Sequence, residues 1–328
     1  MRMTRRRLAF SRRAVLTLTA AAVLGTTGAA YAEYPDRPVR IIAPVGAGGG
    51  VDVMARLLAQ ALSERMHQTF VVENKPGAAG IIGTKYVIGT PADGYTLLYA
   101  PSSIALSVVV HKKPPYDINK ELTPIINVGI SPYALVVNPS VPVHNLKELI
   151  AYAKAHPGKL NYSSPGVGSA SHLAAEMLQT RAGIKMVHVP DKGMGGALLD
   201  LISGQVQVLF ASVPAIEHHG PDRVRPIAMA EKKRSALLPN LPTMAESGMP
   251  GFAVANWSGL LAPAGLDPKI VKKLHDEVVA VLATPEMKAR VKKLGYDMIE
   301  STPQEFGDDV RTDIARWRPV AQGAGIVK

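Results

Sequence analysis

One short segment constrains the fold of this chain more than any other, because a strand pattern gives way to a helix pattern across a run of glycines. Val39–Ala43 is apolar and rich in β-branched residues, four glycines follow in Val45–Gly50, and Val51–Met66 repeats apolar residues at helical spacing. The first N–H groups of a helix lack partners within it, and glycine lets an anion approach them closely. The segment therefore predicts an α/β fold in which the start of this helix binds a small anion. The expected contact positions are Gly46, Ala47, Gly48, Gly49, Gly50, Val51 and Asp52.

The first 32 residues have the pattern of a removable export signal. Six arginines without an acid precede an apolar run, Ala14–Leu24, and the small-residue exit Ala30-Tyr31-Ala32. We expect cleavage near Ala32–Glu33 and a periplasmic location. Ser11–Leu16 also fits a twin-arginine signal, so the general secretory and twin-arginine routes both remain open. The apolar run is shorter than the ~20 residues that a membrane helix needs, and no later stretch approaches that length.

Charge and cysteine content narrow the possible partners. Removal of the six signal arginines lowers the net charge from +11 to +5, and the remaining charges are spread without an aromatic-interleaved basic stripe. The chain has no cysteine, which excludes disulfides, thiolate nucleophiles, cysteine-bound metals and a lipid-modified N-terminal cysteine. We therefore expect a free monomer that binds no nucleic acid, cofactor or metal.

Strand and helix patterns alternate along the chain, which is typical of sheets covered by helices. The expected strands are Val39–Ala43, Phe70–Glu73, Thr96–Ala100, Ile125–Val128, Tyr133–Val137, Lys159–Ser163, Met186–Val189, Val206–Phe210, Val224–Met229 and Trp257–Ala262. The last ninety residues are expected to be almost wholly helical, with helices over Pro268–Ala283, Pro285–Leu294 and Pro303–Gln322. A middle block, residues 125–234, is inserted between residues 33–124 and 235–328. This order predicts two lobes with two chain crossings, as in a hinged clamp.

A second glycine-rich loop lies in the middle block and repeats the order of the first. A strand ending at Ser163 leads through glycines and hydroxyl residues to a helix expected from Leu173. The expected contact positions are Ser163, Ser164, Gly166, Val167, Gly168, Ser169, Ser171 and His172. Either loop alone is explained by a tight strand-to-helix turn. The pair favours a ligand held between two helix starts, one from each lobe.

Other strand ends add candidates, because ligands of open α/β sheets collect at the carboxyl ends of strands. Asp191 and Lys192 follow the strand that ends at Val189, and Ser212 follows the strand that ends at Phe210.

The sequence supports two enzyme hypotheses less well than a binding function. Gly46 and Gly48, with Glu73 ending the next strand, resemble part of a dinucleotide fingerprint, but Val51 occupies its third glycine position. Ser169 or Ser171 with His172 would suit an exported hydrolase, although no nucleophile-elbow, P-loop or zinc-protease motif occurs.

Motifs along the whole mature chain resemble the substrate-binding receptors of tripartite tricarboxylate transporters, the Bug receptors. The motifs are Tyr34–Pro38, Pro44–Asp52, Val72–Ala78, Asp93–Leu98, Pro157–Ser164, Val187–Pro190, Leu241–Gly248 and Gly259–Gly265. The resemblance implies a periplasmic binding protein of type II-like fold, with two α/β lobes of mixed, mostly parallel sheets joined by two crossing strands. It also implies capture of a small carboxylate by backbone amides and delivery to inner-membrane transporter subunits. A sensor component that docks on a signalling partner is the alternative within the binding class.

The chain departs from the family pattern at a few positions. Asp191 stands where the family often has tyrosine, Ala211-Ser212 where it often has Asp-Asn, and Gly46-Ala47 where proline is frequent. Asp191 would repel a polyanion and attract an amino group. An amino acid or a small monocarboxylate is therefore favoured over citrate, unless the neighbouring Lys192 cancels the effect.

Overall fold

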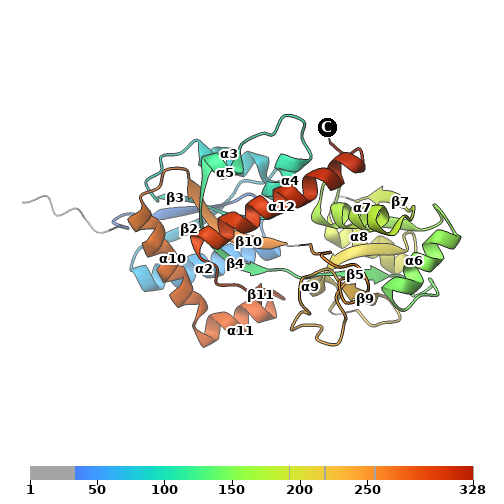
Figure 1. Ribbon diagram of the computed structural model, residues 1–328. Helices are drawn as coiled ribbons and strands as arrows, with labels where there is room; N and C mark the ends of the chain where they lie inside the picture. The colour runs from blue at the N-terminus through green and yellow to red at the C-terminus, as the bar shows by residue number, and fades with distance from the viewer. Residues whose placement is uncertain (1–33, 192, 218, 255, 328) are drawn as a thin grey trace, which may run out of the picture. The chain divides into compact units, whose positions relative to one another are not determined.

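The computed structural model describes residues 34–191, 193–217, 219–254 and 256–327 (Figure 1). Internal contacts divide the chain into Met1–Asp36 and Arg37–Lys328. The predicted export signal and its cleavage site lie outside the described residues, as does Lys192. The description that follows concerns the second unit.

The first sheet has six strands in the order β11-β4-β10-β3-β1-β2. The strands are β1 (Val39–Ala43), β2 (Phe70–Asn74), β3 (Thr96–Pro101), β4 (Leu122–Ile130), β10 (Trp257–Pro263) and β11 (Asp297–Met298). β1 runs parallel to β2 and β3, whereas β10 runs antiparallel to β3 and β4. The helices of this part are α2 (Gly50–Met66), α3 (Ile81–Ile88), α4 (Ser103–Val109), α5 (Ile118–Glu121), α10 (Pro268–Leu282), α11 (Pro285–Lys293) and the 3₁₀ turn η1 (Ala78–Gly80).

The second sheet has five strands in the order β7-β6-β8-β5-β9. They are β5 (Tyr133–Val137), β6 (Asn161–Ser164), β7 (Val187–Pro190), β8 (Val208–Ser212) and β9 (Arg225–Met229). Its helices are α6 (Leu146–Ala155), α7 (Ala170–Ala182), α8 (Met194–Ser203) and α9 (Val213–Ile216). β6 is parallel to β7 and β8, so the loops that follow these three strands leave the same edge of the sheet.

The chain passes from the first sheet to the second between β4 and β5, and returns between β9 and β10. The boundary expected after Pro124 falls inside β4, so the first crossing lies at Ser131-Pro132 instead. The second crossing includes the expected boundary at residues 234–235.

The C-terminal helix α12 (Pro303–Gly323) packs against β4 and α4 of the first part and against α7 of the second (Figure 1). Its start is fixed by a capping box in which Thr302 and Glu305 exchange hydrogen bonds. The apolar face of α12, which includes Phe306 and Trp317, is buried. The Trp257 indole N–H donates to the Asp313 carboxylate at 2.7 Å, which joins α12 to the start of β10.

The predicted strands all occur, with ends that agree with the prediction or differ by at most three residues, and the mixed sheets are confirmed. Among the described strands, five of the nine pairings are antiparallel, a larger share than expected, because the crossing strands β4, β5 and β10 run against their neighbours. α7 begins at Ala170, three residues before the expected start. This shift places Ser171 and His172 inside the first turn of α7.

Candidate functional site

The first glycine-rich loop joins β1 to α2 and leaves the start of α2 without a side-chain cap. Gly49 is the N-cap residue, with an extended backbone (φ −77°, ψ 163°), and it has no side chain to accept from the first-turn amides. Gly48 has φ +85°, a conformation that glycine adopts without strain. A Cβ atom at Gly46 or Gly48 would meet nothing within 4 Å. The unpaired amides of α2 are therefore open to an approaching group.

The Asp52 side chain holds the first glycine-rich loop in place through hydrogen bonds. This side chain is buried and accepts hydrogen bonds from the Gly48 N–H (2.8 Å), the Asn74 amide (2.7 Å) and the Arg56 guanidinium (3.1 Å). Burial raises the pKa of this carboxyl, but the hydrogen bonds from Gly48, Arg56 and Asn74 outweigh burial and leave the pKa below its usual value. Asp52 is thus an ionised anchor whose oxygens are already engaged.

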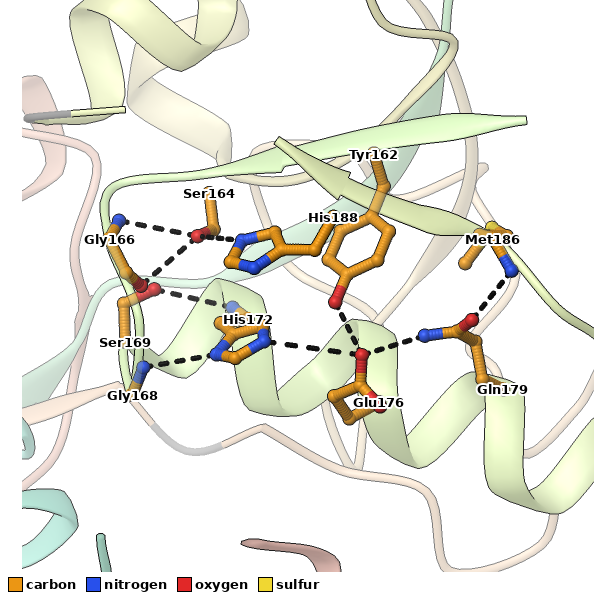
Figure 2. Close-up of polar contacts among 10 residues, drawn as sticks. All are labelled: Tyr162, Ser164, Gly166, Gly168, Ser169, His172, Glu176, Gln179, Met186 and His188. Carbon is orange, nitrogen blue, oxygen red and sulfur yellow. Dashed lines mark hydrogen bonds and ion pairs between the residues drawn. The ribbon is translucent and has the colours of Figure 1, made fainter. Parts of the chain in front are cut away.

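The second loop joins β6 to α7 with the same backbone geometry. Gly168 has φ +81°, and the N-cap Ser169 is extended (φ −69°, ψ 160°). The Ser169 hydroxyl accepts from the His172 N–H, and the Gly168 N–H donates to His172 Nδ1 at 3.0 Å (Figure 2). In both loops, therefore, the third helical residue accepts the N–H of the left-handed glycine. The acceptor is a carboxylate in one loop and an imidazole in the other.

Three stacked rings lie behind the second loop (Figure 2). The His172 and His188 ring centroids are 3.9 Å apart, and those of His188 and Tyr162 are 4.7 Å apart. His188 Nε2 is hydrogen-bonded to the Ser164 hydroxyl at 2.8 Å, and Ser164 in turn accepts from the Gly166 N–H. The stack thus supports the loop at two separate amides.

Both imidazoles of the stack are neutral at neutral pH. Burial, and secondly the neighbouring His188, lower the pKa of His172 to about 4, and burial lowers the pKa of His188. Because Nδ1 of His172 accepts from Gly168, its proton lies on Nε2, which is 4.0 Å from Glu176 Oε1. Tyr162 also donates to Glu176, and burial and that carboxylate raise the pKa of Tyr162.

Some predicted contact residues face away from the loop surface. The Ser163 hydroxyl donates to the Val189 carbonyl at 2.9 Å, and the Ser171 hydroxyl donates to the Phe210 carbonyl at 2.7 Å. Both serines are buried. They hold the loop in place because strand β6 and the first turn of α7 direct them into the sheet.

Two further predicted contact residues, Asp191 and Ser212, lie at the ends of β7 and β8. The Asp191 N–H donates to the Ser164 carbonyl at 2.9 Å, and its carboxylate lies over Gly196, where a Cβ atom would be 2.2 Å from Oδ1. Ser212 is the N-cap residue of α9 at the end of β8. Val167 is 49% exposed at the tip of the second loop.

A cavity of about 160 Å³ connects the second loop to the first part of the chain. Val167 and Gly168 line it together with Ala78, Ala79 and Val110, whereas Gly46–Asp52 do not. A Cβ atom at Gly168 would be 3.2 Å from Val110 Cγ1. The second loop therefore lies against the end of α4 in this conformation, beside the turn that follows β2.

The pairing of Ser169 or Ser171 with the His172 ring, which the hydrolase hypothesis requires, does not form. Ser169 accepts from the His172 backbone, Ser171 donates to a carbonyl, and the His172 ring is engaged with Gly168. Neither hydroxyl is hydrogen-bonded to the imidazole, so the arrangement lacks an activated nucleophile. Among residues 34–191, 193–217, 219–254 and 256–327, no helix is long and apolar enough to cross a bilayer.

Sequence reasoning did not assign a site role to His188 or Tyr296. His188 lay within one of the family motifs, which was the available signal. Tyr296 lies beside Gly50 of α2, although it is far from that residue in sequence.

Comparisons with known proteins show which family the chain is similar to. A family model described as "Tripartite tricarboxylate transporter family receptor" matches residues 54–326. Protein BugT of Bordetella pertussis is 37% identical over 295 residues, which cover 89% of this chain and 90% of that protein.

Two solved structures of similar proteins carry a named ligand. R. palustris Rpa4515 with adipate is 35% identical with a TM-score of 0.78, and the match covers 89% of this chain and 99% of that one. MatC from Rhodopseudomonas palustris with bound malate is 29% identical with a TM-score of 0.75, and the match covers 88% and 100%. The resemblance drawn from the motifs and the expected two-lobed α/β fold are confirmed.

Proposed function

The chain belongs to the tripartite tricarboxylate transporter receptor family, and from this premise we propose that it captures a small carboxylate between its two glycine-rich loops. The captured ligand is then delivered to membrane subunits of a transporter. We place this activity in the periplasm, after removal of the export signal near Ala32–Glu33.

The matched pair of loops is the observation that carries this proposal. Each loop follows a strand, turns at a glycine with φ near +80°, and opens a helix whose third residue holds the loop from inside. A helix start of this kind offers several N–H donors and the positive end of the helix dipole. Three or four charge-assisted hydrogen bonds of about 1.5–3 kcal/mol each, less the cost of association, leave room for micromolar affinity.

The hydrogen bonds already present divide the candidate residues into two groups. Asp52, His172, Ser163 and Ser171 engage their polar side-chain atoms within the protein, so their role is to hold the loops. The N–H groups of Gly48 and Gly168 are engaged in the same way. We therefore assign ligand contact to the remaining positions of the two loops, above all to the uncapped first turn of α2.

The ligand class is a small organic acid. Adipate and malate, the ligands in the solved structures of two similar proteins, are dicarboxylates. We therefore propose a mono- or dicarboxylate or an acidic amino acid as the ligand.

The substitution Gly49→Leu tests the proposal. The backbone of Gly49 suits any residue, and a Cβ atom there would meet only the Gly46 carbonyl oxygen, at 4.0 Å. Leucine therefore leaves the fold intact while its side chain covers the anion approach. We expect the variant to lose affinity at least tenfold in calorimetric titrations with adipate, malate, succinate, aspartate and glutamate.

Gly323→Leu is the matched control, because a Cβ atom at Gly323, near the end of α12, meets no atom within 4 Å. This variant should bind like the wild type. Equal affinity of Gly49→Leu and the wild type would contradict the assignment of the first loop, and consumption of the ligand by the wild type would contradict a receptor function.

A further inference from the structure

A chain of buried hydroxyl groups ends beside the first turn of α2. The Tyr99 hydroxyl on β3 is hydrogen-bonded to the Ser258 hydroxyl on β10 at 3.0 Å. The Ser258 side chain also lies near Tyr296, which precedes β11, and partly offsets the effect of burial on the pKa of Tyr296. Tyr99 is 0%, Ser258 1% and Tyr296 8% exposed. Residues from three distant parts of the sequence thus place their hydroxyls in one row.

The open end of this row lies at the candidate site. A Cβ atom on Gly50, the first residue of α2, would be 3.4 Å from the Tyr296 hydroxyl oxygen. Trp257, which precedes Ser258, and Asp297, which follows Tyr296, line a cavity of about 520 Å³ beside α12. Because successive side chains of a strand face opposite sides, the Ser258 side chain of β10 faces away from this cavity.

The position of Tyr296 is fixed from several directions. The ring packs against Gly129 of β4, where a Cβ atom would be 3.6 Å from Cδ1 of the ring. The preceding Gly295 has φ +71°, and a Cβ atom there would be 2.1 Å from Cγ of Pro214 in α9. The Tyr296 segment is therefore held between the crossing strand and the helix that follows Ser212.

The row contains more hydroxyl protons than hydrogen bonds between its members, so a proton remains that can be donated to another group. Three hydroxyls carry three protons, and the hydrogen bond between Tyr99 and Ser258 uses only one of them. Burial raises the pKa of Tyr296 to about 12 and that of Tyr99 well above its usual value, so both phenols keep their protons at neutral pH.

We propose that the Tyr296 hydroxyl donates a hydrogen bond to a carboxylate oxygen of the ligand at the start of α2, and so selects ligands with an oxygen acceptor there. This inference rests on the proposed function. A phenol donor beside backbone amides stabilises an anion and leaves an ammonium or methyl group unpaired. Tyr296 would then be a side-chain determinant of specificity in a loop that otherwise reads its ligand through the main chain.

Tyr296→Phe removes the donor and keeps the ring. We expect about a tenfold or greater loss of affinity, as for a lost hydrogen bond to a charged group, in calorimetric titration with whichever of adipate, malate, succinate, aspartate and glutamate the wild type binds. Ser258→Ala, which breaks the row one step back, should weaken binding by a smaller factor. It provides a second reading if the phenylalanine variant folds poorly by circular dichroism.

Tyr116→Phe is the matched control. Tyr116 is 5% exposed and donates to the Ile104 carbonyl at 2.8 Å, so its hydroxyl proton is already engaged within the protein. Its loss should lower the melting temperature and leave affinity unchanged. Wild-type affinity in both Tyr296→Phe and Ser258→Ala would overturn the inference alone. A wild type that binds none of the five acids would overturn the proposed function, and the inference with it.

Discussion

The buried imidazole of His172 makes the stability of the second loop depend on pH. Burial lowers the pKa of His172 to about 4, whereas an unfolded chain has the ordinary value near 6.5. Between these values the unfolded state binds more protons than the folded state, so the free energy of unfolding falls as the pH falls. Linkage with these two values gives a loss of about 2 kcal/mol from pH 7 to pH 5 and about 3 kcal/mol by pH 4.

Other groups titrate in the same range and contribute with the opposite sign. Burial raises the pKa of Glu231 and of Asp309, so these carboxyls bind more protons in the folded state and favour folding at lower pH. A pH profile of the wild type alone therefore mixes several contributions. The difference between the wild type and a His172 variant isolates the imidazole.

His172→Asn is the informative variant, because the equivalent residue of the first loop is an aspartate of the same length. Asp52 accepts the Gly48 N–H from that position, so an asparagine oxygen can accept the Gly168 N–H in the same way. Loss of the ring stacked on His188 should destabilise the variant by an amount that does not change with pH. The part of the pH-dependent loss that His172 contributes should disappear, whereas the contribution of His188, whose pKa burial also lowers, remains.

Urea unfolding followed by tryptophan fluorescence and circular dichroism, at several pH values between 7 and 4, measures this difference. The stability of His172→Asn relative to the wild type should rise by about 2 kcal/mol between pH 7 and pH 5. A difference that stays constant over this range would refute the argument, because it would mean that His172 titrates alike in the folded and unfolded states.

Two further predictions concern the first loop and export. Asp52→Ala leaves the Gly48 N–H and neighbouring donors without their acceptor and should cost about 1–3 kcal/mol in urea unfolding, whereas Asp276→Ala, which removes an exposed ion pair, should cost less than about 1 kcal/mol. Replacement of Arg12 and Arg13 by lysine should block export through the twin-arginine route and spare the general secretory route. Cell fractionation and the mass of the exported protein distinguish these outcomes and test the cleavage site.

Much of the fold follows from local sequence signals. Strands and helices were predictable where apolar periodicity is strong, and the helix starts at Thr284 and Thr302 where threonine precedes proline. β11 was missed because two residues carry no periodicity, and its position depends on pairing with β4. The start of α7 was placed late because Ala170 and Ser171 have no local feature that separates a first helical turn from a loop.

The candidate site was predictable as backbone but not as side chains. The strand, glycine and helix order located both loops, since glycine is needed where φ is positive. Which polar atoms those loops already use was not readable, because it depends on partners such as Asn74 and His188 that pack from other strands. Tyr296 was missed for the same reason, since its neighbours Tyr99 and Ser258 are distant in sequence and meet it only in the folded sheet.

In both loops the N–H of the left-handed glycine donates to a side chain, which is the Asp52 carboxylate in the first loop and the His172 imidazole in the second. Because Asp52 and His172 each take up one glycine N–H, the donors left for a ligand are main-chain amides that almost any sequence could supply. The loops can therefore hold a carboxylate without encoding which acid it belongs to. Ligand identity must then depend on the few side chains placed around them, of which Asp191 and Tyr296 lie beside different helix starts. Similar proteins with the same fold bind adipate and malate, which agrees with main-chain binding of the carboxylate and side-chain selection of the acid.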